Sequence, residues 1–266
     1  MNQIVAGRYA GRRCLVTGGG SGIGQATVMR MLAEGGTVVA GDISEAGLAD
    51  TVEKAGADAA RLTTATVDVA DEESVVAAVA SAIETLGGLD VVVNAAGILR
   101  SSHTLDTTVE QFERVLRVNL TGTFLVIRQA LPALIASQHA AVVNFSSTSA
   151  AFGHPYMAAY AASKGGIQSM THALAAEYAK QGVRFTAVQP GSISSGMTDG
   201  SGRSGQSVGP GFPQDIDVRL LGKLLPAIGK GFAGAETVAS VVAMLASDDG
   251  VFITGTEVRV DGGTHF

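Results

Sequence analysis

TGGGSGIG, at residues 17–24, is the stretch of this chain that says most about its fold. It follows the apolar run Cys14-Leu15-Val16 and precedes a helix-like segment that begins near Gln25. A strand, a glycine turn and a helix N-terminus in this order form an anion site, because glycine lets the backbone approach a phosphate and the first helical amides point toward it unpaired. The sequence therefore predicts that a phosphate-bearing ligand binds at this turn.

The residues around the glycines narrow the class of ligand. A P-loop has Lys and then Ser or Thr after its last glycine, whereas Gln25 and Ala26 follow Gly24, so ATP is disfavoured. Gly18, Gly22 and Gly24 also read G-x-x-x-G-x-G instead of the usual dinucleotide pattern G-x-G-x-x-G. The turn thus departs from both common phosphate-binding patterns.

Length and charge restrict the kind of protein. With 266 residues, 46% of them hydrophobic, the chain can bury one large core, and we expect a single domain over residues 1–266. The net charge is −6 and no cluster of Lys or Arg appears, so no nucleic-acid partner is expected. The lone Cys14 lies in an apolar run and is interpreted as a buried structural thiol.

Hydropathy predicts neither a membrane span nor a secretory signal. The longest stretch without Asp, Glu, Lys or Arg runs over residues 129–163, and polar residues interrupt it repeatedly. The N-terminus carries Arg8, Arg12 and Arg13, and no apolar segment of a signal peptide stands before them. We therefore expect a cytoplasmic protein with no membrane partner.

Short β-rich runs alternate with helical patterns along most of the chain, which is typical of parallel βα units. Several of the strand candidates are almost entirely apolar, as in strands covered by helices on both faces. The predicted fold is α/β, a Rossmann-type doubly wound, seven-stranded parallel sheet with helices on both faces. The strand candidates are 13–17, 37–42, 62–68, 90–94, 140–145, 183–188 and 257–260, and the helix candidates are 23–34, 44–55, 72–86, 108–137, 159–181 and 236–247.

One segment, at about residues 192–234, interrupts this alternation. Its first part is rich in glycine, and its second part contains an apolar patch with Leu220, Leu221, Leu224 and Leu225. A loop of this length inside a compact domain is either a surface insertion or a functional element. We favour a substrate lid with glycine hinges.

Asp42 closes the second strand candidate and follows Gly24 by 18 positions. An acid near this distance accepts hydrogen bonds from the adenosine ribose hydroxyls, and its charge would repel a 2′-phosphate. Ile43 and Ser21 supply no positive charge to hold such a phosphate, so NAD is favoured over NADP. Asp42 also fits a helix cap before Ser44, and this alternative stays open.

Tyr160 and Lys164 lie four positions apart on a helix candidate, hence on one face. The spacing alone is common, but the neighbours are almost all small, which leaves room for a ligand. A charged lysine about 4 Å from the phenol would interact with it by about 4 kcal/mol at an effective dielectric near 20. This corresponds to roughly three pKa units and would bring the phenol pKa from about 10 toward 7.

These motifs together resemble the short-chain dehydrogenase/reductase family from about Gly11 to the C-terminus. The family pattern T-G-x-x-x-G-I-G matches residues 17–24, and Ser147 precedes Tyr160 by 13 positions, as in the family. The resemblance implies that Asn119, Ser147, Tyr160 and Lys164 form the catalytic tetrad. The NAD contacts that follow from it, with Asp42 and Ile43, are Gly18, Ser21, Gly22, Ile23, Gly24, Asp68, Val69, Asn94, Ala95, Ala96, Gly97, Tyr160, Lys164, Pro190, Gly191, Ile193 and Ser195.

The resemblance also implies a mechanism of hydride transfer between an alcohol or ketone and the nicotinamide. Ser147 would bind the substrate oxygen and Tyr160 would exchange its proton. Lys164 would lower the tyrosine pKa and hold the ribose, and Asn119 would interrupt a long helix and hold a water behind Lys164. Ala95 replaces an asparagine of the family turn N-N-A-G, for which we expect a small structural effect.

The substrate pocket is predicted from residues near the tetrad and in the lid. Ser149, His154, Met157 and Met197 are its candidates, with Tyr156 beside them, and their character favours a small or medium, mainly apolar substrate. His154 is interpreted as a wall residue, because no acid or metal-spaced partner accompanies it, and no metal site is predicted. Arg100 and Arg203 are the only cations expected nearby.

Two alternatives to a dehydrogenase remain open. The chain could be a non-catalytic NAD-binding sensor or scaffold, although intact Ser147, Tyr160 and Lys164 argue against one. An epimerase or dehydratase that recycles its nicotinamide would need a further substrate domain. The family resemblance implies a homotetramer.

Overall fold

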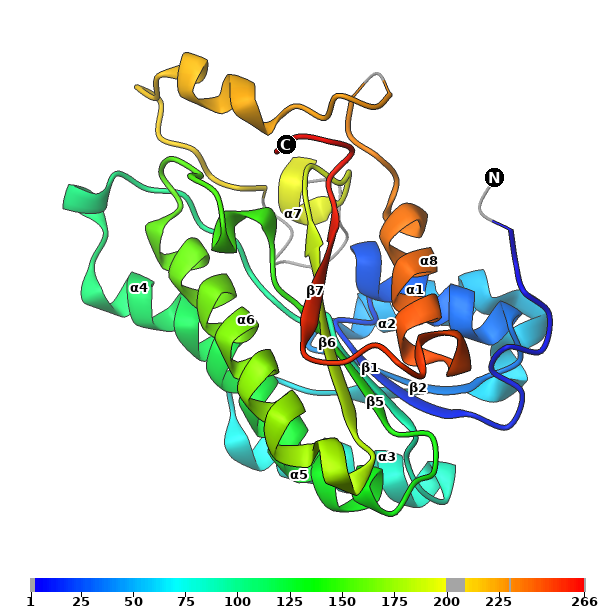
Figure 1. Ribbon diagram of the computed structural model, residues 1–266. Coiled ribbons are helices and arrows are strands. Elements are labelled where there is room, and N and C mark those ends of the chain that lie inside the picture. The colour runs from blue at the N-terminus through cyan, green and yellow to red at the C-terminus, as the bar shows by residue number, and fades with distance from the viewer. Residues whose placement is uncertain (1–2, 200–208, 230, 266) are drawn as a thin grey trace.

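The computed structural model describes residues 3–199, 209–229 and 231–265. Its core is one sheet in which all neighbouring strands are parallel, in the order β3-β2-β1-β4-β5-β6-β7. This order reverses direction beside β1 and confirms the predicted doubly wound sheet (Figure 1). The strands are β1 Arg13–Thr17, β2 Thr37–Asp42, β3 Leu62–Thr66, β4 Val91–Asn94, β5 Ala141–Phe145, β6 Arg184–Pro190 and β7 Thr256–Val260.

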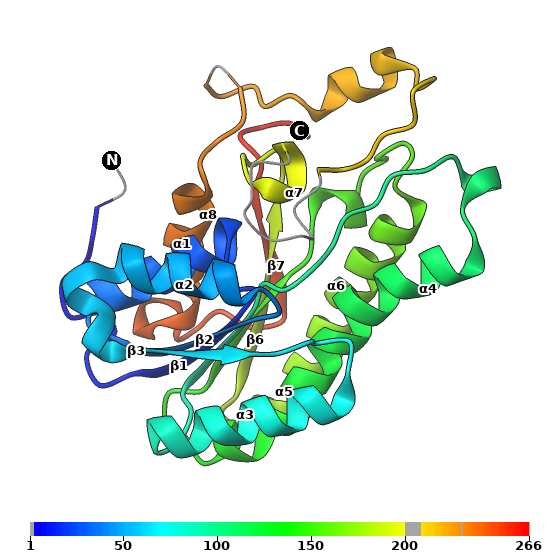
Figure 2. The same cartoon turned by 180° about the vertical axis from the view of Figure 1, so that it is seen from behind.

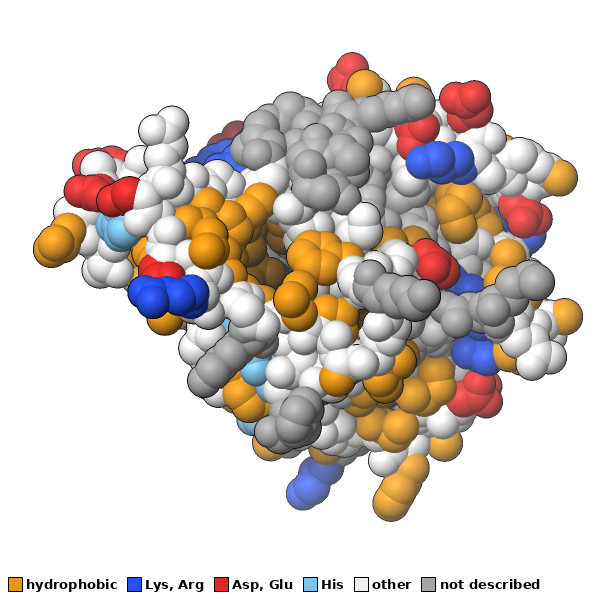
Figure 3. Space-filling view, turned by 90° about the horizontal axis from the view of Figure 1, so that it is seen from above, with side chains coloured by type: hydrophobic (Ala, Val, Ile, Leu, Met, Phe, Trp, Pro, Cys, Tyr) orange, Lys and Arg blue, Asp and Glu red, His pale blue; other side chains and the backbone are white. Residues whose placement is uncertain are grey.

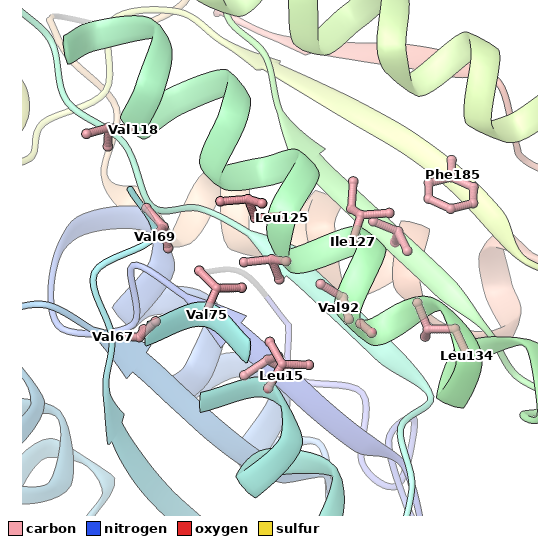
Figure 4. Packing of buried hydrophobic residues seen from close by; sticks show 14 of the residues in the cluster. Leu15, Val67, Val69, Val75, Val92, Val118, Leu125, Ile127, Leu134 and Phe185 are labelled. Carbon is pink, nitrogen blue, oxygen red and sulfur yellow. The ribbon is translucent and has the colours of Figure 1, made fainter. Parts of the chain in front are cut away.

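Alternate residues of the central strands face opposite sides of the sheet, as the period of a strand requires. Leu15 and Val92 pack with Phe185 in one buried cluster, whereas Cys14 and Val91 belong to the other. Figure 4 shows the first cluster between the sheet and the helices α3 and α5. Cys14 is buried, as predicted for a structural thiol.

Two helical layers cover these two faces (Figures 1 and 2). Their buried apolar side chains pack against the sheet and against neighbouring helices, which stabilises the fold by roughly 25 cal/mol per Å² of apolar surface removed from water. One layer holds α1 Gly22–Ala33, α2 Glu45–Ala55 and α8 Ala235–Ala246, and the other holds α3 Glu72–Leu86, α4 Val109–Leu116, α5 Gly122–Ile135 and α6 Ala158–Tyr178.

Two predicted elements end or bend where polar side chains intervene. The strand candidate 62–68 stops at Thr66, because Asp68 accepts a hydrogen bond from the amide of Ala70 and turns the chain toward α3. The helix candidate 108–137 contains a π-helical turn at Arg117–Thr121. Such turns insert an extra residue into a helix and frequently lie at functional sites.

The continuous helix Val109–Ile135 is long and apolar enough to cross a membrane by length and composition. Half of its most apolar window is buried inside the fold. Packing against α3 and the sheet therefore accounts for its apolar character.

The predicted lid is partly described. Residues 209–229 lie across the top of the view in Figure 1, and they include a 3-10 turn at Val218–Leu224. A short helix, α7 Gly196–Asp199, follows β6. Gly200, Gly202, Gly205 and Arg203, which entered the sequence-based prediction, lie outside the described residues.

Candidate active site

A cavity of about 390 Å³ lies beyond the carboxyl ends of the strands. Seen from above, the surface is hollowed and hydrophobic side chains line the hollow (Figure 3). This is where ligands bind in open parallel sheets. The predicted residues that line it are Gly18, Ser21, Gly22, Ile23, Gly24, Asp42, Ile43, Asp68, Val69, Ala95, Ala96, Gly97, Ser147, His154, Met157, Tyr160, Lys164, Pro190, Gly191, Ile193, Ser195 and Met197.

The glycine turn is built as the sequence predicts. Gly18 has φ +72°, and a side chain there would lie 2.6 Å from the amide nitrogen of Ala96. Ser21 caps α1 without a side-chain hydrogen bond, and the first turn of the helix carries no acidic residue. The helix N-terminus therefore keeps amides and a positive dipole end for an anion, which fits the diphosphate of a dinucleotide.

The Asp42 carboxylate is held by two backbone amides. It accepts from Gly20 at 2.9 Å and from Ser44 at 2.9 Å, so it ties the glycine turn to the start of α2. Ser44 itself caps α2, since its hydroxyl accepts from the amide of Gly47. The alternative in which Asp42 caps the helix is therefore wrong, because Ser44 is the cap, and Asp42 lines the cavity.

Ser147, Tyr160 and Lys164 come together at the other end of the cavity. Ser147 follows β5, and the other two residues lie on consecutive turns of α6. The Ser147 hydroxyl accepts from the amide of Ser149 at 3.1 Å, and it lies next to Tyr160, whose pKa it acts to lower. All three side chains are buried.

The prediction that Lys164 lowers the pKa of Tyr160 toward 7 is wrong for this structure. Lys164 Nζ lies 5.6 Å from the centroid of the phenol ring and donates to the carbonyl oxygen of Phe145 at 2.6 Å. Burial raises the pKa of Tyr160 to about 12, against the lowering effect of the Ser147 hydrogen bond. Burial also lowers the pKa of Lys164 to about 7. Desolvation, which disfavours the charged form of each group, is thus the largest cause of both shifts.

Asn119 lies behind this group of residues and does not line the cavity. It sits in the π-helical turn, where its side chain accepts from the amide of Ile98 at 2.8 Å. Its amide group donates to the Ile98 carbonyl and to the hydroxyl of Ser163, each at 3.0 Å. Asn119 therefore joins the strand-end loop after β4 to α6, next to Lys164.

Two other predicted ligand contacts lie elsewhere. Asn94 is buried in the sheet, where it donates to Asn144 at 2.9 Å, and Asn144 donates to Thr171 at 3.0 Å. Asn94 thus ties β4 to β5 and is not among the described cavity residues. Ser149 is also absent from that lining, because its side chain is buried in the 3-10 turn after β5.

The described part of the lid closes the cavity with apolar side chains. Its position is fixed by contacts with two loops: the amide of Ser101 donates to the carbonyl of Pro210 at 2.8 Å, and the amide of Asp217 donates to the Tyr156 hydroxyl at 2.9 Å. Tyr156 therefore holds the lid and does not line the cavity, contrary to expectation. The lid and adjacent side chains on the cavity are Pro210, Phe212, Leu221, Leu224, Leu225 and Phe232.

Sequence reasoning missed several cavity residues. Arg114 is the only arginine among the described residues of the lining, whereas Arg100 was the expected cation. Arg114 precedes Val118, another lining residue, by one helical turn, so the 3.6-residue period could have placed both on one face. Leu99 and Phe145 also line the cavity, and no motif marks them, because Phe145 is an apolar residue at the end of β5 and Leu99 lies in the loop after β4.

Comparison with known proteins agrees with this geometry. A family model described as short chain dehydrogenase matches residues 12–204. The chain belongs to the short-chain dehydrogenase family. Similar proteins include the 3-oxoacyl-[acyl-carrier-protein] reductase FabG of Thermotoga maritima, 34% identical with 96% of this chain and 98% of the relative covered. A 3-alpha-(or 20-beta)-hydroxysteroid dehydrogenase of Mycobacterium bovis is 35% identical, with 98% and 92% covered.

A solved structure of a short chain dehydrogenase from Mycobacterium paratuberculosis bound to NAD is also similar. It is 30% identical, its TM-score is 0.88, and the alignment covers 97% of this chain and 99% of that one. The Rossmann-like sheet of this short-chain dehydrogenase is therefore the family fold. These relatives are dehydrogenases and reductases, which makes the chain an oxidoreductase of that family.

Proposed function

We propose that this short-chain dehydrogenase transfers a hydride between NAD(H) and a small or medium, mainly apolar alcohol or ketone. The observation that carries the proposal is that Ser147, Tyr160 and Lys164 line the same cavity as the uncapped N-terminus of α1. A proton donor and an anion site thus share one space. A non-catalytic NAD sensor would need only the second.

The residues at the reacting end have separate roles. Bound NAD would supply the hydride acceptor for oxidation, and NADH the donor for reduction. Ser147 donates a hydrogen bond to the substrate oxygen, and Tyr160 takes or gives the proton of that oxygen. Lys164 holds the ribose hydroxyls when charged, and Asn119 acts as a positioning residue by fixing the Ile98 backbone and Ser163 beside α6.

The apolar lining supports a neutral substrate. Leu221, Leu224 and Phe212 of the lid face the cavity, and Met157 and Met197 belong to its wall. An anionic substrate would lose hydration among these apolar side chains. Lys164 and Arg114 are the only cationic side chains of the described lining, and we assign Lys164 to the ribose.

The cofactor assignment gives the first prediction. NAD should be used at least about tenfold more efficiently than NADP, because the Asp42 carboxylate repels a 2′-phosphate. Asp42→Asn should reduce this preference, since the amide is neutral and keeps one acceptor for the backbone. The measurement is kcat/KM for both cofactors with the same substrate. Equal use of NAD and NADP by the unmodified enzyme would contradict the role of Asp42.

The proton donor gives a second prediction, on pH. Reduction requires the neutral phenol of Tyr160 together with the charged amine of Lys164. With the pKa of Tyr160 raised to about 12 and that of Lys164 lowered to about 7, both forms coexist below pH 7. The kcat/KM for ketone reduction should therefore be constant below about pH 7 and fall above it as Lys164 loses its proton. A value that rises from pH 7 to pH 9 would contradict these protonation states.

A panel of secondary alcohols and ketones, tested in both directions with NAD and NADP, tests the proposed function itself. Turnover of a neutral apolar substrate with NAD is the expected result. Tight NADH binding without turnover of any compound would instead favour the sensor or scaffold. We also propose that the protein is cytoplasmic and forms a homotetramer. Sedimentation of the purified protein would test the tetramer.

A further inference from the structure

His154 contributes an imidazole to the wall of the cavity that also contains Ser147 and Tyr160. It precedes Tyr160 by six positions, in the loop between β5 and α6. Met157 and Met197, which line the same cavity, offer no strong hydrogen-bonding group. A nitrogen atom in this wall can therefore select among substrates that otherwise fill the same apolar space.

The hydrogen bonds around Thr148 decide which nitrogen of His154 carries the proton. The Thr148 hydroxyl donates to the carbonyl oxygen of Pro190 at 3.4 Å, and its oxygen lies 3.2 Å from His154 Nε2. Because the hydroxyl has one proton, both contacts are hydrogen bonds at once only when Nε2 donates to the Thr148 oxygen. The tautomer with a proton on Nε2 leaves Nδ1 with a lone pair, as an acceptor.

The ring of His154 is held in place by its surroundings. The ring of His265 packs against it at 5.6 Å between centroids, and His265 is itself stacked on Phe152 at 4.3 Å. Among the described residues, Nδ1 of His154 has no hydrogen-bond partner and is not one of the buried unpaired atoms. It therefore remains open to a ligand.

The imidazole is neutral near physiological pH. Burial lowers the pKa of His154 to about 4, and the neighbouring His265 acts in the same direction. No carboxylate ion pair holds a proton on His154 in the described part of the chain. The group thus suits a neutral hydrogen-bond donor and not a carboxylate or phosphate.

We propose that His154 Nδ1 is a specificity determinant that accepts a hydrogen bond from a second, unreacting hydroxyl of the substrate. The substrates are then diols or hydroxyketones with an apolar frame, in which one carbon is oxidised or reduced beside Tyr160 and the other hydroxyl binds His154. This assignment rests on the proposed function, because it requires turnover at the Ser147 and Tyr160 end. It adds one polar requirement to a substrate otherwise described as apolar.

The test compares cyclohexanol with the cis and trans isomers of 1,2-, 1,3- and 1,4-cyclohexanediol, using NAD. The unmodified enzyme should oxidise at least one diol with a kcat/KM about tenfold above that of cyclohexanol, as expected for one additional hydrogen bond. His154→Leu should abolish this preference, because leucine fills the same wall without a hydrogen-bond acceptor. His154→Asn should restore much of it, because the side-chain oxygen can occupy the position of Nδ1.

Met157→Leu is the matched control, since it changes the same wall without altering its hydrogen bonding. It should change kcat/KM for the diols and for cyclohexanol by the same factor. The inference is overturned if His154→Leu changes kcat/KM for every diol and for cyclohexanol by the same factor, so that each ratio stays as it is in the unmodified enzyme. Failure of the proposed function is a different result: the unmodified enzyme would bind NADH and oxidise neither the diols nor cyclohexanol nor any member of the wider panel.

Discussion

Tyr160→Phe is expected to lower kcat by at least about 100-fold, the contribution typical of general acid–base catalysis. The substitution removes the only group that we assign to proton exchange with the substrate oxygen, and it keeps the buried ring. NADH binding, measured by fluorescence titration, should change little. The loss should appear equally in kcat and in kcat/KM, since the interaction is made in the transition state.

Tyr178→Phe provides the matched control for this experiment. Tyr178 ends the same helix, α6, and its ring packs against Phe185 at 6.1 Å, away from the cavity. The same loss of a hydroxyl there should leave kcat within about twofold, because surface changes of this kind have small effects. Normal turnover by Tyr160→Phe would remove the basis for the proposed mechanism.

Gly24→Ala is expected to have the largest effect on the cofactor end. A methyl group at Gly24 would lie 2.1 Å from the carbonyl oxygen of Gly18, which is a backbone atom of the glycine turn and has no side chain that can move away. Overpacking of this kind costs about 1–3 kcal/mol and occasionally more. The turn must shift, so the free energy of unfolding should fall by about 3 kcal/mol and NADH should bind at least about tenfold more weakly.

Gly165→Ala is the matched control, because it makes the same change of residue in a helix without a steric clash. Gly165 is also helical, in α6, and nothing lies within 4 Å of the position of an added methyl group. Alanine is favoured over glycine inside a helix, so this variant should be more stable by up to about 1 kcal/mol. Denaturant unfolding and NADH titration of both variants provide the measurements. Normal NADH binding by Gly24→Ala would show that the close packing of Gly24 on Gly18 is not needed for cofactor binding.

Much of the fold follows from local patterns in the sequence. The glycine turn after β1 and the helix α3, with its cap at Asp71, lie where apolar periodicity and capping residues predict them. β3 and the helix over residues 108–137 differ, because the hydrogen bonds that end or bend them come from individual polar side chains. Asp68 turns the chain after β3, and residues 117–121 form a π-helical turn.

Site residues were predicted best where a sequence motif with a known spacing contains them. Tyr160, Lys164 and Ser147 share a cavity as expected, whereas Asn94 points into the sheet toward Asn144. Ser149 and Tyr156 also lie off the cavity, since side chains near a strand end can face either way and spacing does not decide between them. Arg114 comes from a helix with no motif of its own.

The sequence by itself determined the parallel sheet, the glycine turn and the family, because hydrophobic period, glycine positions and residue spacing are local properties. Only the tertiary structure decided the ionisation of the site and the polarity of its wall. Burial, which depends on every neighbour at once, raises the pKa of Tyr160 and lowers that of Lys164. The Thr148 hydroxyl lies between the Pro190 carbonyl, 42 positions away in the chain, and the imidazole of His154 in the wall of the apolar cavity.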